Sequence, residues 1–267
     1  MPLISVILPV YKPQKKFLTL AIQSILNQTY KNLELIIVED KTELTNEQII
    51  KNFSDSRIIY ILNEARTDFA RQINSGLKVA KGEFVARMDA DDISEPNRLE
   101  KELNFLLSHP GISFVGSNLT IINEKNDLMG ARFYPQNSLA IAKKMRLRNS
   151  LAHPTVMLRK RDLLDLGSYN QEFDTLADYD LWARGILAGL KYYNLPDKLL
   201  RYRLHSGAYK SHSLKQQLKD TLNIKKKYFR FKAGWSFLAE FRYWAEKILL
   251  FLPGEFIYWL FMKTNIK

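Results

Sequence analysis

The 267-residue sequence contains no cysteine, which excludes disulfide bonds, thiol nucleophiles and zinc sites with cysteine ligands. It also lacks an uninterrupted run of about 18 to 20 apolar residues, the length that a transmembrane helix needs. Two phosphate-binding loops are missing as well, since no G-x-G-x-x-G follows the first apolar run and no G-x-x-x-x-G-K-[ST] occurs anywhere. These absences argue against a dinucleotide-dependent oxidoreductase and against a P-loop NTPase.

Acidic residues are nearly absent from the stretch between Lys198 and Lys232. It has 11 basic side chains and a single acid, Asp220, whereas residues 1–197 have 25 basic and 24 acidic side chains. The stretch therefore supplies +10 of the formal net charge of +12. Aromatic residues then accumulate, because 13 of the chain's 32 lie between Tyr228 and Phe261. The C-terminal part is thus chemically distinct from a nearly neutral body.

Residues 213–267 are expected to form a basic and aromatic helical tail. Lysine-rich amphipathic helices with tryptophan and phenylalanine on the apolar face are typical of segments that lie on anionic membranes. The alternative is that the apolar face packs on the body or on a partner subunit. Nucleic-acid binding fits the charge, but the large apolar aromatic surface argues for lipid instead. The apolar start at Leu3 lacks a basic region before it, so we expect a cytoplasmic protein without a signal peptide.

Apolar runs and helical patterns alternate through the first 120 residues. The runs are rich in β-branched residues, which is typical of strands covered on both faces. They span Ile4–Tyr11, Leu33–Asp40, Arg57–Leu62, Glu83–Met88 and Ile112–Ile122. Apolar residues recur at helical spacing within 17–26, 69–80 and 99–107. This order predicts an α/β fold with a mostly parallel sheet flanked by helices.

Acidic residues follow the fourth of these runs. Asp89 and Asp91 are separated by one residue, so in an extended segment both carboxylates would face one ligand. Ligands of parallel sheets bind beyond the carboxyl ends of the strands. Carboxylate oxygens suit Mg²⁺ or Mn²⁺ bridging a diphosphate. The alternative for these residues is a solvated Asp-rich turn.

Several motifs resemble those of the bacterial family 2 glycosyltransferases, which have the GT-A fold. They are SVILPVYK at 5–12, ARMDADDISEPNRLEKEL at 86–103, HPTVMLRK at 153–160, ADYDLWAR at 177–184 and LPDKLLRYRLHSGAYKS at 195–211. The resemblance covers roughly residues 3–212. It implies a GT-A glycosyltransferase domain at 1–212, followed by the tail at 213–267.

The resemblance also implies roles for individual residues. The nucleotide-sugar pocket would contain Pro9, Val10, Tyr11, Asp40 and Asp89. Asp91 would be a ligand of Mn²⁺ or Mg²⁺, joined by His205 if the segment that carries it folds over the donor. Arg203 is a further expected donor contact, since guanidinium groups suit diphosphate oxygens. Arg87 is placed with the donor as well, or it pairs with a core acid.

Asp178 matches the general base of inverting members of that family. The residue before it is Ala177 where the family has glutamate, so Asp180 stays an alternative base. Aspartate is also common as a helix cap, and one of the two can serve that purpose alone. A base at Asp178 would take the proton of an acceptor hydroxyl during attack on the anomeric carbon.

The resemblance therefore predicts a metal-dependent inverting transferase that moves one sugar from a nucleotide sugar, a UDP-sugar, to a saccharide acceptor. The acceptor would be lipid-linked and belong to capsule, exopolysaccharide or lipopolysaccharide synthesis, at the inner face of the cytoplasmic membrane. Single addition is favoured because the Q-x-x-R-W motif of processive synthases is absent. One alternative is a sugar-phosphate nucleotidyltransferase, although PVYKPQKK stands where a Gly-rich loop would be expected. Another is a catalytically silent scaffold that binds a membrane or a partner.

Overall fold

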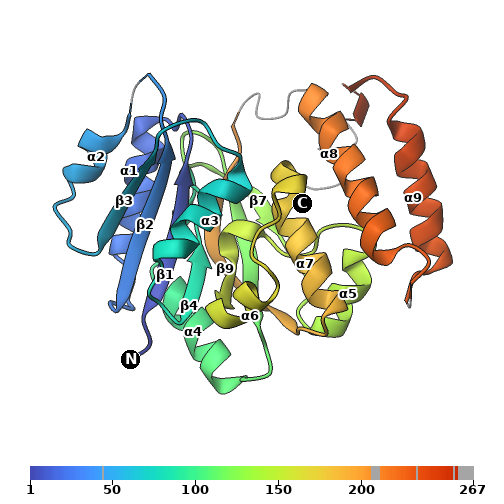
Figure 1. Cartoon of the computed structure of the whole chain (residues 1–267), viewed down its shortest axis with the longest axis horizontal. Helices are drawn as coiled ribbons and strands as arrows, with labels where there is room; N and C mark the ends of the chain where they lie inside the picture. The colour runs from blue at the N-terminus through green and yellow to red at the C-terminus, as the bar shows by residue number, and fades with distance from the viewer. Residues whose placement is uncertain (44, 206–210, 233, 255, 258–267) are drawn as a thin grey trace.

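The computed structural model describes residues 1–43, 45–205, 211–232, 234–254 and 256–257. Helices flank both faces of one mixed sheet, and the C-terminal helices stand beside this body (Figure 1). The strands are β1 (Ile4–Val10), β2 (Leu33–Asp40), β3 (Ile58–Asn63), β4 (Phe84–Arg87), β5 (Ile93–Ser94), β6 (Phe114–Ile122), β7 (Leu128–Arg132), β8 (Met157–Arg159) and β9 (Tyr192–Arg203). The α-helices are α1 (Lys15–Leu26), α2 (Glu47–Lys51), α3 (Phe69–Val79), α4 (Arg98–Ser108), α5 (Ser138–Met145), α6 (Lys160–Asp165), α7 (Ala177–Leu187), α8 (Ser211–Ile224) and α9 (Phe237–Leu249).

The sheet has the strand order β3-β2-β1-β4-β8-β6-β9-β5. β7 is off this path and pairs with Leu119–Ile122 of β6, beyond the segment that pairs with β8. The first four strands of this order are parallel, as the sequence predicts. β8 then runs antiparallel between β4 and β6, and β9 lies parallel to β6. The α/β fold with a mostly parallel sheet is therefore confirmed. The antiparallel strand β8 has only three residues, too few for an apolar pattern to indicate it.

Successive side chains of β1 point to opposite faces of the sheet and pack in two different hydrophobic clusters. Ile4, Val6 and Leu8 pack in one cluster with buried residues of α1 and α4. Ile7 packs in the other cluster, with residues of α3 and α7. Each of these side chains contributes roughly 1.5–3 kcal/mol by leaving water. Burial on both faces holds the carboxyl ends of β1 and β4 side by side at one edge of the sheet.

The C-terminal helices pack on the body through their inner side. Ile224 and Phe229 are buried in the same cluster as Trp182 of α7. Between them Lys225, in a π-helical turn at Lys225–Phe229, is buried and forms an ion pair with Glu246 of α9 at 2.5 Å. The predicted helices are present, and one basic residue of the tail thus faces protein. Residues 258–267 of the predicted tail lie outside the described residues.

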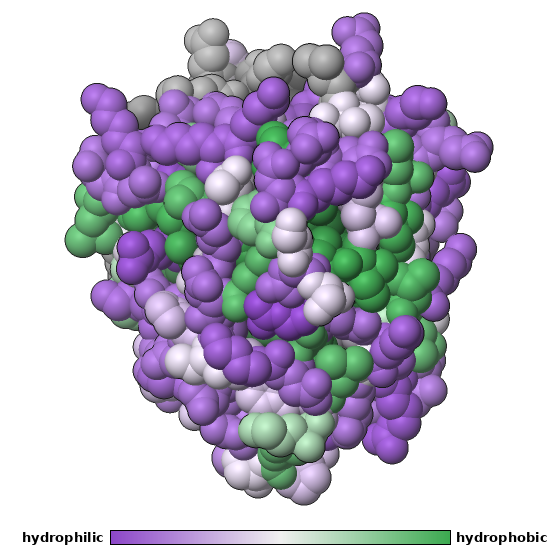
Figure 2. Space-filling view, turned by 90° about the vertical axis from the view of Figure 1, so that its left-hand side faces the viewer, coloured by the Kyte–Doolittle hydropathy of each residue, from purple (hydrophilic) through white to green (hydrophobic). Residues whose placement is uncertain are grey.

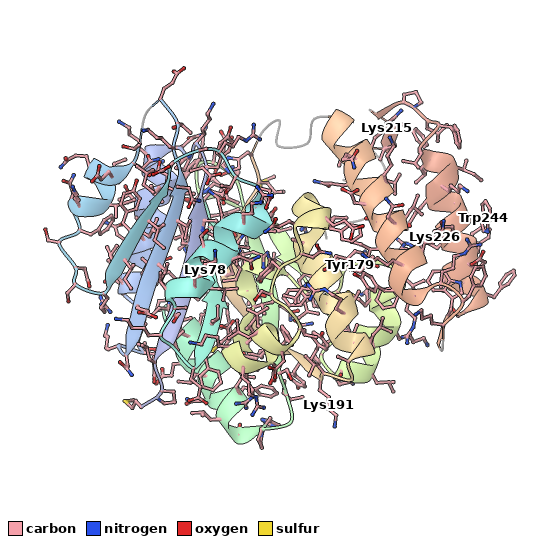
Figure 3. All side chains as sticks on the ribbon, viewed as in Figure 1. Lys78, Tyr179, Lys191, Lys215, Lys226 and Trp244 are labelled. Carbon is pink, nitrogen blue, oxygen red and sulfur yellow. The ribbon has the colours of Figure 1, made fainter. Side chains whose placement is uncertain are left out.

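The outer side of α9 is apolar and exposed. Its exposed apolar side chains are Phe237, Leu238, Phe241, Trp244 and Ile248. Trp244 lies on the side of α9 that faces away from the body (Figure 3). The face at the other end of the molecule, beside α2 and β3, is dominated by hydrophilic side chains with hydrophobic ones between them (Figure 2). None of the helices in the described ranges has both the length and the hydrophobicity that a membrane crossing requires.

Candidate functional site

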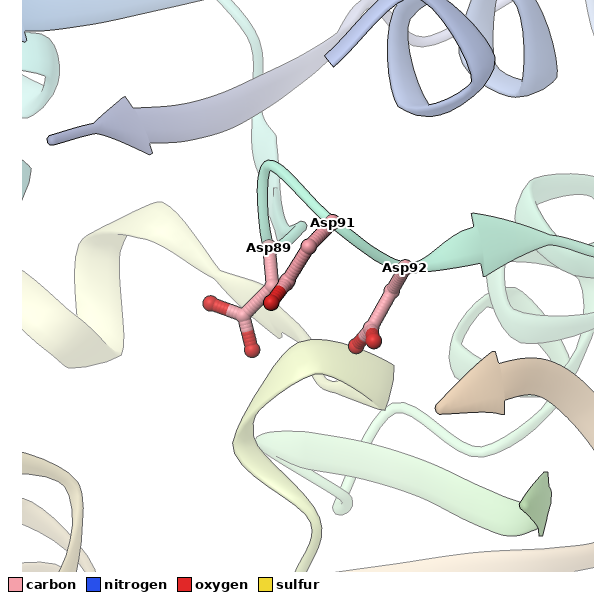
Figure 4. Close-up of side chains that lie close together, drawn as sticks. All are labelled: Asp89, Asp91 and Asp92. Carbon is pink, nitrogen blue, oxygen red and sulfur yellow. The ribbon is translucent and has the colours of Figure 1, made fainter. Parts of the chain in front are cut away.

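An acidic turn joins β4 to β5. Each of its three aspartates, Asp89, Asp91 and Asp92, offers one carboxylate oxygen, and these oxygens lie within 4.8 Å of one another (Figure 4). The expected extended segment is wrong in detail, because Ala90 and Asp91 form a turn. The turn still brings the carboxylates of Asp89 and Asp91 to the same side, and it adds Asp92, which the D-x-D pattern does not include.

Arg203, at the end of β9, forms hydrogen bonds with the acidic turn. Its backbone N–H donates to Asp92 Oδ1 at 2.8 Å, and its Nε donates to the Asp91 carbonyl oxygen at 2.8 Å. The guanidinium stacks over the ring of Phe17 at 4.1 Å, and only 2% of the residue is exposed. The structure therefore makes Arg203 a positioning residue of the acidic turn. Its predicted contact with the diphosphate of the donor stays a prediction.

The acidic turn has the properties of a divalent-cation site. Burial, followed by the charge of Asp89, raises the pKa of Asp91, and the same causes raise the pKa of Asp92. Asp92 Oδ2 is buried and accepts no hydrogen bond. A cation would stabilise the buried negative charges and would give Asp92 Oδ2 a partner. A set of hard oxygen ligands suits Mg²⁺ or Mn²⁺. The residues present thus fit the metal that the resemblance implies.

His205 lies beside this turn, as predicted. Its Nε2 is 2.7 Å from Asp91 Oδ2, and its Nδ1 is 3.5 Å from Glu124 Oε1. The ring also packs against Phe17, with the ring centroids 5.4 Å apart. The imidazole is therefore oriented by two carboxylates and is within reach of a cation bound at Asp91. Its role as a ligand remains a prediction.

A cavity of about 390 Å³ opens in front of the acidic turn. Five residues predicted to bind the donor or the metal line it: Pro9, Tyr11, Asp89, Asp91 and His205. The Arg66 guanidinium lies 4.8 Å from the centre of the half-exposed Tyr11 ring. We call this space the β1 cavity. It combines an aromatic wall with a cluster of carboxylates, as a site for a metal-bound nucleotide requires.

Two predicted donor residues, Val10 and Asp40, do not line the β1 cavity. Val10 is fully buried, and its carbonyl oxygen accepts a hydrogen bond from Gln72 Nε2 at 3.0 Å. The Asp40 carboxylate is 1% exposed and accepts three hydrogen bonds from Asn63 and Thr67. These side chains therefore support the loops around the cavity, and their role as donor contacts stays a prediction.

A second cavity, of about 530 Å³, lies on the other side of Asp89. Asp89 and Phe69 line both cavities, so the two spaces adjoin at the acidic turn. Asp178 and His153 line only the second one, which we call the Asp178 cavity. The site is thus divided into a part with the acidic turn and a part with a separate carboxylate.

Asp178 is the carboxylate of this second cavity. It accepts hydrogen bonds from the Tyr179 backbone N–H and from Asn149 Nδ2, both at 2.7 Å. Burial nevertheless raises the pKa of Asp178 to about 6. Such a carboxylate is ionised at neutral pH and is more basic than an ordinary aspartate, which suits a general base.

Asp180 has a structural role instead. It is fully buried, forms an ion pair with Arg184 Nε at 2.7 Å and accepts a hydrogen bond from Tyr228 Oη at 2.7 Å. It lines neither cavity. Ala177, where the resembled family has glutamate, packs in the core. Of the two aspartates, only Asp178 lines a cavity, and its role as the base stays a prediction.

Arg87 contacts the two residues that both cavities share, Asp89 and Phe69. Its Nη2 forms an ion pair with Asp89 Oδ1 at 2.5 Å, and its guanidinium stacks on Phe69 at 4.8 Å. Burial and the nearby Arg87 charge lower the pKa of His153 well below its usual value, so this histidine is neutral. Arg87 thus pairs with Asp89, which is a residue of the site and not an acid of the core. Its side chain lines the Asp178 cavity.

Other residues of the Asp178 cavity were missed by the sequence motifs. They are Arg132, Tyr134, Lys144, Arg148 and Asn149. All of them come from the stretch that runs from the end of β7 to the loop after α5, where the sequence has no recognised motif. The only signal there is local charge, because AKKMRLRN at 142–149 has four basic side chains.

The sequence of this chain is similar to those of known proteins. A family model described as "Glycosyl transferase family 2" matches residues 5–167. The O-antigen biosynthesis glycosyltransferase WbnJ from Escherichia coli is 35% identical over 76% of this chain and 80% of the relative. The E. coli UDP-Glc:alpha-D-GlcNAc-diphosphoundecaprenol beta-1,3-glucosyltransferase WfgD is 34% identical over 67% of this chain and 68% of the relative.

Two solved structures share the fold. S. aureus TarS 1–349 in complex with UDP has a TM-score of 0.61 and 20% identity, covering 83% of this chain and 64% of that one. The mannosyltransferase PcManGT from Pyrobaculum calidifontis, in complex with GDP-Man and Mn²⁺, has a TM-score of 0.64 and 14% identity, covering 95% of this chain and 71% of that one. At these identities the likeness supports the fold alone.

Proposed function

Because this chain belongs to glycosyl transferase family 2 and is a glycosyltransferase with the GT-A fold, we propose that it transfers one sugar with inversion to a lipid-linked saccharide. The donor is a nucleotide sugar, a UDP-sugar, and the product belongs to cell-surface polysaccharide synthesis. One observation carries this proposal: two cavities adjoin at Asp89, one lined by Asp91 and the other by Asp178.

The two cavities divide the substrates between them. The donor occupies the β1 cavity, so that its diphosphate meets the acidic turn and its sugar points past Asp89. The acceptor occupies the Asp178 cavity, with the reacting hydroxyl at the Asp178 carboxylate. Asp178 takes the proton of that hydroxyl while the oxygen bonds to the anomeric carbon and the bond to the nucleoside diphosphate breaks. A single displacement of this kind inverts the anomeric configuration and needs no covalent intermediate.

In this scheme the acidic turn would hold the cation that neutralises the leaving group. Asp89, Asp91 and Asp92, with His205, would hold Mn²⁺ or Mg²⁺, which when bound stabilises negative charge on the departing diphosphate. Arg203 keeps the turn in shape through its two hydrogen bonds. Arg87 fixes Asp89 at the boundary between the cavities.

The printed names of relatives and neighbours support the substrate classes. WfgD is named for UDP-Glc and a diphosphoundecaprenol acceptor, and the TarS structure contains UDP. PcManGT was solved with GDP-Man, so the nucleotide-sugar class has broader support than the uracil base. For this chain we propose a UDP-sugar and a lipid-linked acceptor.

Measuring transfer from a panel of UDP- and GDP-sugars tests this function. The purified full chain is incubated with Mn²⁺ and synthetic lipid-linked monosaccharides, and the products are identified by mass. We expect turnover with at least one UDP-sugar and elongation of the acceptor by one residue. Absence of turnover and hydrolysis with every donor would favour a silent scaffold. Formation of a nucleotide sugar from a sugar 1-phosphate would favour the nucleotidyltransferase alternative.

We also propose that residues 1–212 form a transferase unit and that residues 213–267 form a membrane-associating tail. The exposed apolar side of α9 would lie in the headgroup region on the inner face of the cytoplasmic membrane. The three aromatic residues of this side, Phe237, Phe241 and Trp244, would contribute most of the buried apolar area.

Replacing these three aromatic residues with serine is expected to weaken binding to vesicles of mixed neutral and anionic lipids by about 10-fold or more. Sedimentation with the vesicles measures the bound fraction. Serine at Leu107, Leu128 and Leu164, which are exposed on other elements, is the matched control and should leave binding unchanged. Equal binding of both triple variants would contradict the proposed membrane face.

A further inference from the structure

The aromatic ring of Phe69 lies where the two cavities adjoin. Of the residues in the described ranges, Phe69 and Asp89 are the ones that line both the β1 cavity and the Asp178 cavity. A sugar that passes from a donor in one cavity to an acceptor in the other must cross this boundary. Asp89 offers a carboxylate there, whereas Phe69 offers a partly exposed aromatic ring. The transfer scheme gives a role to Asp89 and none to Phe69.

Two neighbouring side chains fix the orientation of the Phe69 ring. The Arg87 guanidinium lies 4.8 Å from the centre of the ring, and the His153 ring lies nearly perpendicular to it with the centroids 5.7 Å apart. Arg87 is itself held by its ion pair with Asp89. His153 Nε2 lies 2.8 Å from Tyr169 Oη. Because both neighbours are held in turn, the ring presents a preformed apolar surface, which a ligand does not have to order when it binds.

The backbone that leads into Phe69 is fixed as well. Phe69 is the first residue of α3, and Asp68 caps this helix by accepting a hydrogen bond from the Arg71 backbone N–H at 2.7 Å. One residue earlier, the Thr67 backbone N–H donates to Asp40 Oδ2 at 2.8 Å. Asp40 is the last residue of β2, so the sheet determines where α3 begins. This hydrogen bond makes Asp40 part of the support that positions the Phe69 ring.

We propose that the Phe69 ring packs against the ring of the sugar that is transferred and thereby contributes to donor specificity. This inference rests on the proposed function and names a specificity-determining residue for its donor. A pyranose has apolar C–H faces and a rim of hydroxyl groups, so a flat aromatic ring matches one of its faces. Asp89, at the same boundary, can accept hydrogen bonds from hydroxyl groups of the rim. An aliphatic side chain would fill the same space without offering a flat surface.

Titrations of the full chain with UDP, UDP-glucose and UDP-galactose, in the presence of Mn²⁺, test the proposal. The ratio of the Kd of each UDP-sugar to the Kd of UDP isolates the contribution of the sugar. Phe69→Leu keeps most of the side-chain volume but removes the ring, and it should raise this ratio by about 5- to 10-fold for the donor that the wild type prefers. Phe69→Tyr keeps the ring and should retain the wild-type ratio. UDP alone should bind equally well to all of these proteins, which also shows that they fold.

Phe133→Leu is the matched control, because this exposed phenylalanine lines the Asp178 cavity but not the β1 cavity. It should leave the ratio at the wild-type value. A wild-type ratio in Phe69→Leu for both donors would overturn the proposal. An equal loss of UDP binding in Phe69→Leu would also overturn it, since Phe69 would then only support the shape of the β1 cavity. None of these measurements requires an acceptor or turnover, so their failure is separate from failure of the transferase function.

Discussion

Changing Asp178 to asparagine is expected to lower kcat for sugar transfer by about 10²- to 10⁴-fold, the usual contribution of a general base. An amide has nearly the same shape as the carboxylate but cannot take the proton of the acceptor hydroxyl. Donor binding should be unchanged, because Asp178 lines the second cavity and not the β1 cavity. Single-turnover transfer and titration with UDP in the presence of Mn²⁺ measure the two effects separately.

Asp180→Asn is the matched control for that substitution. Asp180 is two residues away and has the same chemistry, but its carboxylate is buried against Arg184 and Tyr228. Removing its charge should lower the melting temperature, since Arg184 loses its partner. The kcat per folded molecule should be retained. Loss of transfer in Asp180→Asn together with normal transfer in Asp178→Asn would reverse the assignment.

Asp91→Asn is expected to reduce kcat/KM by about 10³-fold or more, because metal ions supply several kcal/mol of charge stabilisation. The substitution removes one negative charge from the acidic turn and the carboxylate that His205 contacts. Mn²⁺-dependent binding of the donor should fall in parallel. Both quantities can be measured with one donor by initial rates and by titration with and without Mn²⁺.

Asp127→Asn provides the control for Asp91→Asn. Asp127 is an exposed acid in the β6–β7 turn and lines neither cavity. Its substitution changes net charge equally and should leave kcat/KM and Mn²⁺ dependence unchanged. A metal-independent wild-type reaction, or full activity of Asp91→Asn, would show that the acidic turn does not hold the metal.

The acidic turn shows what sequence can predict about a site of this kind. Apolar runs place the ends of β1 and β4, so Pro9, Tyr11 and Asp89 could be assigned to one edge of the sheet. Val10 and Asp40 occupy equally suitable sequence positions, yet both are buried. Whether a strand-end residue faces the cavity depends on partners from distant loops, such as Gln72 for Val10. The sequence around Val10 and Asp40 does not indicate these partners.

The Asp178 cavity could be predicted only in part. The aspartate itself lies in a motif, whereas Arg132 ends β7 and Arg148 follows α5, and the placement of these elements depends on long-range packing. The tail could also be predicted only in part. Its helices follow from the spacing of apolar residues, but Lys225 is buried with Glu246 because α8 and α9 pack together. Sequence identifies amphipathic helices more readily than it identifies which side the body covers.

The pH dependence of kcat/KM tests most directly the claim that Asp178 is the base. Only its ionised form can accept a proton, and burial raises its pKa to about 6. The account therefore predicts a plateau above that pH and a tenfold fall per pH unit below it. In Asn149→Leu, loss of the hydrogen bond that stabilises the carboxylate should move this limb to higher pH. A limb at the same pH in both proteins, or a flat profile between about pH 5 and 8, would contradict the account.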